Sequence, residues 1–326
     1  MTESTATTAA WSDDDLLALS ARVNNTGRWG AEDELGTLNH LSSAKTREAA
    51  RLVQTGTVLS LAWPITPHTM PSQPGEVEHR TFPNDMSAED YLGLPMHQQG
   101  LTHLDCVSHV AGPDGLVYNG RRLRDVDTPT GLTHGSVYAQ RGGIVTRGVL
   151  LDVPAALGLD WLEPGQEITA PDLDAAERLG NVVVSTGDVS IVRGGVAARE
   201  SVHGPNVYAP GLGPDAIEWL FDREVAVYTG DMPDRVTPLA ARLLGLLPPT
   251  ADDPPAADDD GHPTRFPLPL HQIGIAAMGL VLLDFCRVEE LARTCRELGR
   301  HEFLFVAAAL PVHGGSGSPV NPLAVF

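Results

Sequence analysis

The sequence predicts an α/β fold, with a mixed β-sheet flanked by helices in a single domain. From residue 144 onward, short runs of β-branched residues alternate with helical patterns, which is typical of strands and helices packed in layers. No repeat or linker divides the chain, although its 326 residues would fit two domains of about 150 residues each. We therefore expect one domain over residues 13–326.

The N-terminal part predicts two helices, a strand and a long loop. Three aspartates at 13–15 precede an apolar helical pattern, as acidic residues do in the first turn of a helix, so residues 1–12 are expected to form a flexible tail. A second helix is expected over residues 43–54 and a strand over residues 58–62. Residues 66–95 lack periodicity and are rich in proline and polar residues, which predicts a loop that covers a site.

Further along, strand and helix patterns alternate. The expected strands cover residues 148–153, 182–185, 189–193, 225–229 and 302–310. The expected helices cover residues 170–179, 214–223 and 288–298, and residues 272–283 form a long apolar stretch. Residues 250–265 are acidic and rich in proline, which predicts a solvated loop without chemistry.

The charge of the chain excludes several classes of partner. It has 22 basic and 42 acidic residues, a formal net charge of −20, and Lys45 is its one lysine. Nucleic acids and anionic membranes both require clustered cations, so we expect neither as a partner. The sequence contains no run of about 18 apolar residues, so it predicts no membrane-spanning helix. Three cysteines without framework spacing, and an N-terminus without signal-peptide features, indicate a cytoplasmic protein.

One short segment concentrates side chains that can bind metal. His97, Gln99, His103, Asp105 and His109 are all odd-numbered, so an extended chain would place them on one face. Imidazoles and a carboxylate converging from one segment suit Zn²⁺ or Mn²⁺. The alternative is a solvated strand face carrying ordinary hydrogen-bonded pairs, and the spacing alone does not decide between the two.

A resemblance favours the metal. Residues 102–109, Thr-His-Leu-Asp-Cys-Val-Ser-His, resemble the signature His-x-Gly-Thr-His-x-Asp-x-Pro-x-His of the cyclase-like metal-dependent hydrolases, the family of bacterial kynurenine formamidase and isatin hydrolase. They are more similar to the longer branch of that family, where the signature relaxes to Thr-(His/Gln)-x-Asp-x-x-x-His. Other landmarks of that branch occur in order at residues 28–39, 114–120, 147–153, 187–193 and 314–322. The resemblance implies a swivelling β/β/α fold with a partly barrel-like sheet.

The resemblance also implies roles for individual residues. His103 and Asp105 would be metal ligands, and His109 would lie beside the metal as a ligand or general base. The late His…Glu pair of the family falls on His271 and Asp284. Residues His103, Asp105 and His109 are therefore the candidate catalytic residues, and a divalent metal, Mn²⁺ or Zn²⁺, is the expected cofactor.

Two departures from the family pattern alter the expected ligand set. The first histidine of the signature is Gln99 here, and the late glutamate is Asp284. An amide is a poorer ligand than imidazole and Asp is shorter than Glu, so both changes favour Mn²⁺ or Mg²⁺, or one metal instead of two. His97 could compensate only if the strand bulges. Gln99 is a candidate for both metal and substrate binding, and Trp29 is a second candidate substrate-binding residue.

Three functions are open at this point. The first is metal-dependent hydrolysis of a C–N bond in a small cyclic or N-acyl amide, including aromatic ones, as the family implies. The second is a cyclase or lyase step on a biosynthetic, polyketide-like intermediate. The third is a degenerate small-molecule binder without turnover. The resemblance also implies a homo-oligomer, a dimer or tetramer, with the site near the subunit boundary.

Other polar residues are expected to be structural. Cys106 has the opposite parity from the ligands and is interpreted as a packing residue. Asp188 and Asp231 each follow a glycine and are expected to serve turns. Residues 314–318 are expected to form a tight turn instead of a phosphate loop. Four other histidines, at positions 134, 203, 262 and 313, have no partner pattern and are expected at the surface.

Overall fold

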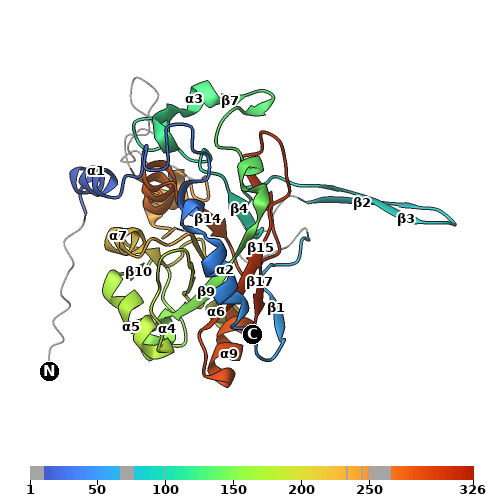
Figure 1. The fold of residues 1–326 in the computed structure, drawn as a ribbon, viewed down its shortest axis with the longest axis vertical. Coiled ribbons are helices and arrows are strands. Elements are labelled where there is room, and N and C mark those ends of the chain that lie inside the picture. The colour runs from blue at the N-terminus through green and yellow to red at the C-terminus, as the bar shows by residue number, and fades with distance from the viewer. Residues whose placement is uncertain are drawn as a thin grey trace.

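A curled, nine-stranded mixed sheet forms the centre of the computed structural model, which describes residues 11–66, 77–98, 100–232, 234–243, 245–248, 250 and 266–326 (Figure 1). The sheet is a half-barrel flanked by helices, which confirms the predicted fold class. In spatial order its strands are β1 (Val58–Ser60), β17 (Leu323–Val325), β15 (Glu302–Ala307), β9 (Ile144–Asp152), β11 (Val189–Arg193), β13 (Val227–Gly230), β14 (Val281–Asp284), β4 (His103–Asp105) and β16 (Gly317–Pro319). Strands β9, β11, β13 and β14 are parallel, and the pairings outside this group are antiparallel.

Helices and small sheets surround this central sheet. The α-helices are α1 (Asp13–Arg22), α2 (Ser43–Ala50), α3 (Leu123–Val126), α4 (Val153–Ala156), α5 (Ala170–Gly180), α6 (Val196–His203), α7 (Pro214–Asp222), α8 (Pro238–Leu243) and α9 (Glu289–Leu298). The 3₁₀-helices are η1 (Gly36–His40), η2 (Tyr118–Gly120) and η3 (Val137–Gly142), and η4 (Leu270–Met278) is a π-helix. Two-stranded sheets pair β2 (Glu78–Pro83) with β3 (Ala88–Gly93), β5 (Leu116–Val117) with β6 (Arg121–Arg122), β7 (Asp127–Thr128) with β8 (Gly131–Leu132), and β10 (Glu167–Ile168) with β12 (Gly211–Leu212). Among the described helices, none combines the length and apolar character that crossing a membrane requires.

The sheet separates two apolar cores, because successive side chains of a strand point to opposite faces. In β14, Leu283 packs in the core that also contains Leu104 of β4, whereas Leu282 packs in the core beside η4 and α7. In β9, Leu150 and Leu151 divide between the two cores in the same way. Because Leu104 faces the first core, its neighbours on β4 point to the face that η4 covers.

The predicted N-terminal helices form, with shifted boundaries. Ser12 accepts a hydrogen bond from the Asp15 backbone and completes a capping box, so Ser12 is the N-cap of α1. Residues 1–10 lie outside the described part of the chain. Helix α2 ends at Ala50, earlier than expected, because the chain then turns to the sheet edge, where Thr55 and Gly56 both donate to the Phe326 carbonyl.

One loop assignment and one strand assignment from the sequence were wrong. Residues 78–93 form the hairpin of β2 and β3 instead of a loop, and this hairpin projects from the body with most of its side chains exposed (Figure 1). A hairpin exposed on both faces carries no apolar alternation by which to recognise it. Residues 182–185 form no strand, because side chains take their backbone donors: Val184 donates to Glu177 at 2.7 Å and Ser185 donates to Asp188 at 2.8 Å.

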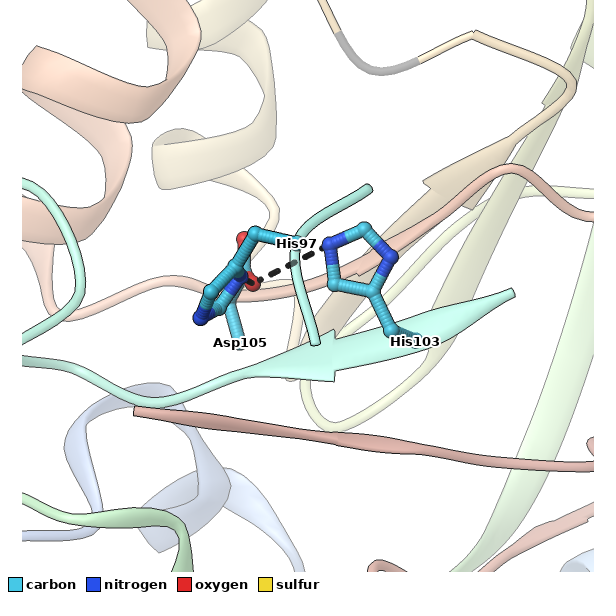
Figure 2. Close-up of side chains that lie close together, drawn as sticks. All are labelled: His97, His103 and Asp105. Carbon is cyan, nitrogen blue, oxygen red and sulfur yellow. Dashed lines mark ion pairs between the residues drawn. The ribbon is translucent and has the colours of Figure 1, made fainter. Parts of the chain in front are cut away.

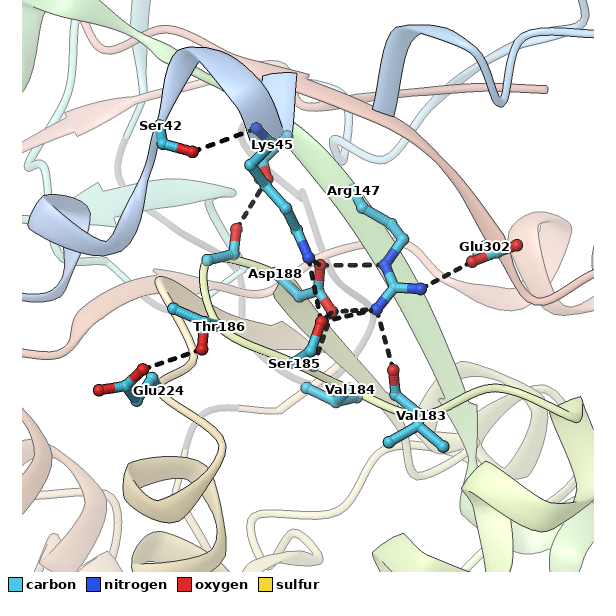
Figure 3. A network of polar contacts seen from close by, with 12 residues as sticks. Ser42, Lys45, Arg147, Val183, Val184, Ser185, Thr186, Asp188, Glu224 and Glu302 are labelled. Atoms are coloured by element: carbon cyan, nitrogen blue, oxygen red, sulfur yellow. Dashed lines mark hydrogen bonds and ion pairs between the residues drawn. The ribbon is translucent and has the colours of Figure 1, made fainter. Parts of the chain in front are cut away.

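Asp188 joins the start of β11 to β9 and α2 through a buried ion-pair network (Figure 3). Its fully buried carboxylate contacts Lys45 Nζ at 2.6 Å and the Arg147 guanidinium at 2.5 Å. Arg147 also pairs with Glu302 of β15 at 2.9 Å. Asp188 also has the expected turn role, because its carboxylate accepts a hydrogen bond from the Ser185 backbone. Lys45, the one lysine of the chain, therefore has a structural contact in this network.

Candidate metal centre

Strand β4 places His103 and Asp105 side by side on the face of the sheet that η4 covers. The strand lies between β14 and β16, with His103 opposite Asp284 and Asp105 opposite Gly317. His103 and Asp105 are almost completely buried, and Leu104 between them points into the opposite core. The alternation expected for this segment therefore holds over the strand itself.

His97 and His109 reach the same place by turns. Among the described residues of this segment, the strand covers 103–105 alone, so the expectation of one continuous strand face over residues 97–109 was wrong. The His109 backbone donates to the Cys106 carbonyl at 3.1 Å, which closes the turn after β4. The rings of His97 and His109 stack with centroids 3.6 Å apart and planes within 5°.

Asp105 lies at the centre of the converging side chains (Figure 2). Its Oδ1 atom is 3.0 Å from His97 Nδ1, 3.5 Å from His103 Nε2 and 4.0 Å from His109 Nε2. Its Oδ2 atom is 3.4 Å from His271 Nε2. Two sets of three ligand atoms result, and they share Asp105: one with His97 and His103, the other with His109 and His271.

The π-helix η4 and strand β14 contribute the other two groups. His271, in the first turn of η4, has its Nε2 atom 3.3 Å from Asp284 Oδ2, and His103 Nε2 is 3.9 Å from that same oxygen. We call the six converging residues the His/Asp cluster; they are His97, His103, Asp105, His109, His271 and Asp284. Phe285, directly after Asp284, has a φ of 57°, a left-handed conformation rare outside glycine, and its ring centroid lies 6.1 Å from that of His103.

Hydrogen bonds at the far nitrogen orient three of the imidazoles. His103 Nδ1 lies 2.7 Å from the Leu101 carbonyl oxygen, to which it can only donate a proton. In the neutral ring, Nε2 then carries a lone pair that faces Asp105. His271 Nδ1 bonds to Asp234, and His97 Nε2 is 2.9 Å from Ser316 Oγ. This arrangement, a ring held at one nitrogen with the other directed inward, is that of metal-binding histidines.

The electrostatics of the cluster are those of a negatively charged, buried site. Burial alone would raise the pKa of Asp105, but the surrounding histidines, His109 foremost, lower it well below its ordinary value. Burial opposes a proton on His271, yet the carboxylates of Asp284, Asp105 and Asp234 raise its pKa well above the ordinary value. Burial lowers the pKa of His109 to about 3, so this ring is neutral at pH 7 and lacks the near-neutral pKa expected of a general base.

The cluster fits a divalent metal ion. His97 Nδ1, both carboxylate oxygens of Asp105 and Asp284 Oδ1 are buried, and none has a hydrogen-bond partner in the described part of the chain. Buried polar atoms are normally paired, so four of them within one cluster require an explanation. Imidazole nitrogens and carboxylate oxygens that face one another without hydrogen-bond geometry are explained by a shared cation between them.

The structure places three of the other residues discussed in the sequence analysis, Trp29, Cys106 and His134, and does not describe Gln99. Gln99 lies outside the described residues, so its expected roles stay predictions. The Trp29 ring meets the His40 ring edge-on, with centroids 5.1 Å apart, and packs against the core; its role in substrate binding stays a prediction. Burial raises the pKa of Cys106 to about 12, which agrees with a packing role. His134 is buried, contrary to expectation.

Sequence reasoning missed Asp234, which lies behind His271. Asp234 is buried and accepts hydrogen bonds from the Leu270 backbone at 2.8 Å, the His271 backbone at 3.2 Å and the His271 ring. It follows β13, so its position after a strand of the parallel group was the available signal. Asp231, in the same connection, instead accepts the first backbone donors of α6, at Gly194, Gly195 and Val196.

Comparisons with known proteins agree with this architecture. Residues 38–235 match the model of the Cyclase family, described as "Putative cyclase". A crystal structure described as a novel cyclase is 26% identical, with a TM-score of 0.76 over 94% of this chain and 99% of its own. Isatin hydrolase A from Ralstonia solanacearum is 18% identical, with a TM-score of 0.53 over 82% of this chain and 91% of its own.

A second isatin hydrolase, bound to the product analogue thioisatinate, is 16% identical, with a TM-score of 0.51 over 88% of this chain and 99% of its own. At these identities the two isatin hydrolases show a shared fold. No curated protein sequence matches the chain. Because the family model covers more than half of the sequence, the chain belongs to the cyclase family.

Proposed function

We propose that this protein is a metal-dependent hydrolase that cleaves the C–N bond of a small cyclic or N-acyl amide. The observation that carries the proposal is the convergence of four imidazoles and two carboxylates with their buried, unpartnered atoms. The isatin hydrolases among the structural neighbours support a hydrolytic reaction on a cyclic amide. Membership in the cyclase family supports an enzyme.

The residues of the cluster would divide the work. His97, His103, Asp105, His271 and Asp284 would hold the metal. A divalent ion bound there would polarise the substrate carbonyl and make a water molecule more acidic. Overall, water adds to the carbonyl carbon, the C–N bond breaks, and the proton released by water passes to the leaving nitrogen.

His109 is the proposed carrier of that proton. Its ring is neutral at pH 7, since burial lowers its pKa to about 3, and its side chain is one of the more exposed members of the cluster. A neutral ring can accept the proton of water and return it to the leaving nitrogen, but a pKa this far below the working pH makes it a weak base. Stacking on His97 fixes the plane of the ring.

The test combines metal analysis with substitution. Purified protein, with its metal content measured, is assayed on a cyclic imide and on an N-formyl aromatic amine, with and without chelator. We expect hydrolysis to disappear on chelation and in His103→Ala, and to fall in His109→Ala. The matched control is His203→Ala, at an exposed histidine on α6. Hydrolysis that survives both chelation and His109→Ala contradicts the proposal.

A cyclisation or lyase reaction is the second candidate, favoured by the match to a structure described as a novel cyclase. A divalent ion held by the same cluster would supply positive charge to stabilise negative charge on a substrate oxygen in such a reaction. Solvent labelled with ¹⁸O separates the two reactions, because hydrolysis incorporates one solvent oxygen into the product and cyclisation does not.

A further inference from the structure

The glycine-rich segment near the C-terminus, residues 314–319, lies against the His97 ring. Its strand β16 pairs with β4, with Gly317 opposite Asp105. Ser316 Oγ is 2.9 Å from His97 Nε2. A Cβ atom added to Gly317 would lie 2.6 Å from Cε1 and 3.1 Å from Nε2 of that ring, so the ring occupies space that only a glycine leaves open.

The contact with Ser316 determines which nitrogen of His97 faces the cluster. Nε2 contacts the hydroxyl, and Nδ1 lies 3.0 Å from Asp105 Oδ1, with no hydrogen-bond partner among the residues that the structure describes. When the Ser316 oxygen accepts the Nε2 proton, Nδ1 keeps a lone pair directed at the same point as the Asp105 carboxylate. His97 stands in a turn rather than a strand, so its own backbone gives the ring little support.

We propose that Ser316 and Gly317 are positioning residues that hold His97 as a metal ligand, in place of the imidazole that the family signature carries at position 99. The segment thereby restores the ligand that the substitution by Gln99 removes. The inference rests on the proposed function, since it requires that the cluster binds metal.

Metal affinity, measured by calorimetry with Mn²⁺ and with Zn²⁺ on the full-length chain, tests this inference. We expect Ser316→Ala to weaken binding by about 10–100-fold, the usual effect of removing the hydrogen-bond partner of a metal-binding histidine. Ser316→Thr, which keeps a hydroxyl, should retain most of the affinity. The matched control is Ser318→Ala, at a fully buried serine of the same segment whose hydroxyl accepts from the Leu310 backbone at 2.8 Å and donates to the Pro319 carbonyl at 2.7 Å.

A double-mutant cycle separates positioning of His97 from a general structural effect. Ser316→Ala should change the affinity no further in a His97→Ala background, because the interaction that it removes is already gone. An equal loss in Ser316→Ala and Ser318→Ala, or a full effect of Ser316→Ala in the absence of His97, overturns the inference while leaving the metal site in place. A wild-type chain that binds neither ion overturns the proposed function as well.

Discussion

Asp234→Ala should weaken metal binding without unfolding the protein. The carboxylate of Asp234 bonds to the His271 ring at Nδ1 and to the Leu270 backbone at 2.8 Å, so one side chain fixes both the ring and the first turn of η4. Without it, His271 can rotate and can carry its proton on Nε2, the atom that faces Asp105 at 3.4 Å. Loss of such a partner weakens metal affinity by about 10–100-fold, which corresponds to about 1.4–2.7 kcal/mol.

The assay is competition for Zn²⁺ or Mn²⁺ against a chelator of known affinity, with Asp231→Ala as the control. Asp231 is buried to a similar degree and accepts three backbone donors at the start of α6, so its loss removes a comparable helix cap but touches no member of the cluster. Asp234→Asn keeps one acceptor oxygen, so its metal affinity should lie between the affinities of the wild type and of Asp234→Ala. Equal affinities in Asp231→Ala and Asp234→Ala would refute the reasoning.

Three further predictions concern stability. Asp188→Asn should lower the free energy of unfolding by about 3–5 kcal/mol, because it removes the fully buried carboxylate that pairs with the partly buried cations of Lys45 and Arg147. Glu302→Gln, at a partly exposed partner of Arg147, should cost much less in the same urea titration. Gly36→Ala should lower the free energy of unfolding more than Gly27→Ala does in that titration. Both glycines have a positive φ, but of the two only position 36 would bring a Cβ into a clash with the Gly279 carbonyl. Saturating Mn²⁺ or Zn²⁺ should raise the melting temperature of the wild type and chelator should reverse this; an unchanged melting temperature would count against a metal bound by the folded state alone.

The sequence predicts the fold best where a strand or helix buries one consistent face. The segment 189–193 is a strand with the expected bounds, because β11 lies at the centre of the sheet. Residues 182–185 have the same β-branched composition, but Glu177 and Asp188 take their backbone donors, and these bonds depend on tertiary positions. The composition of a segment indicates its propensity to form a strand. It does not show whether side chains from elsewhere will take the backbone hydrogen bonds that a strand needs.

The residues of the candidate site also differ in how far the sequence predicts them. His103 and Asp105 could be located from local spacing, because strand alternation places both on one face. His271 and Asp284 were located only through the resemblance, since they meet β4 across a contact spanning more than 160 residues of chain. The position of Asp234 after β13 is its only local signal, and Ser316 carries none, because each acts on a histidine that is distant in the sequence.

The position of His97 changes the argument about which metal the cluster prefers. An amide at position 99 in place of imidazole favours Mn²⁺ or Mg²⁺ over Zn²⁺ only if no other imidazole takes its place. His97 Nδ1 is 3.0 Å from Asp105 Oδ1, closer than the Nε2 atoms of His103 and His109, so an imidazole is present at that side of the carboxylate. The three imidazoles proposed as ligands, those of His97, His103 and His271, exceed what Mg²⁺ sites use, since Mg²⁺ prefers oxygen ligands and retains water. We therefore infer that Zn²⁺ and Mn²⁺ bind this cluster more tightly than Mg²⁺, and that His97→Gln narrows the difference between Zn²⁺ and Mg²⁺ affinities.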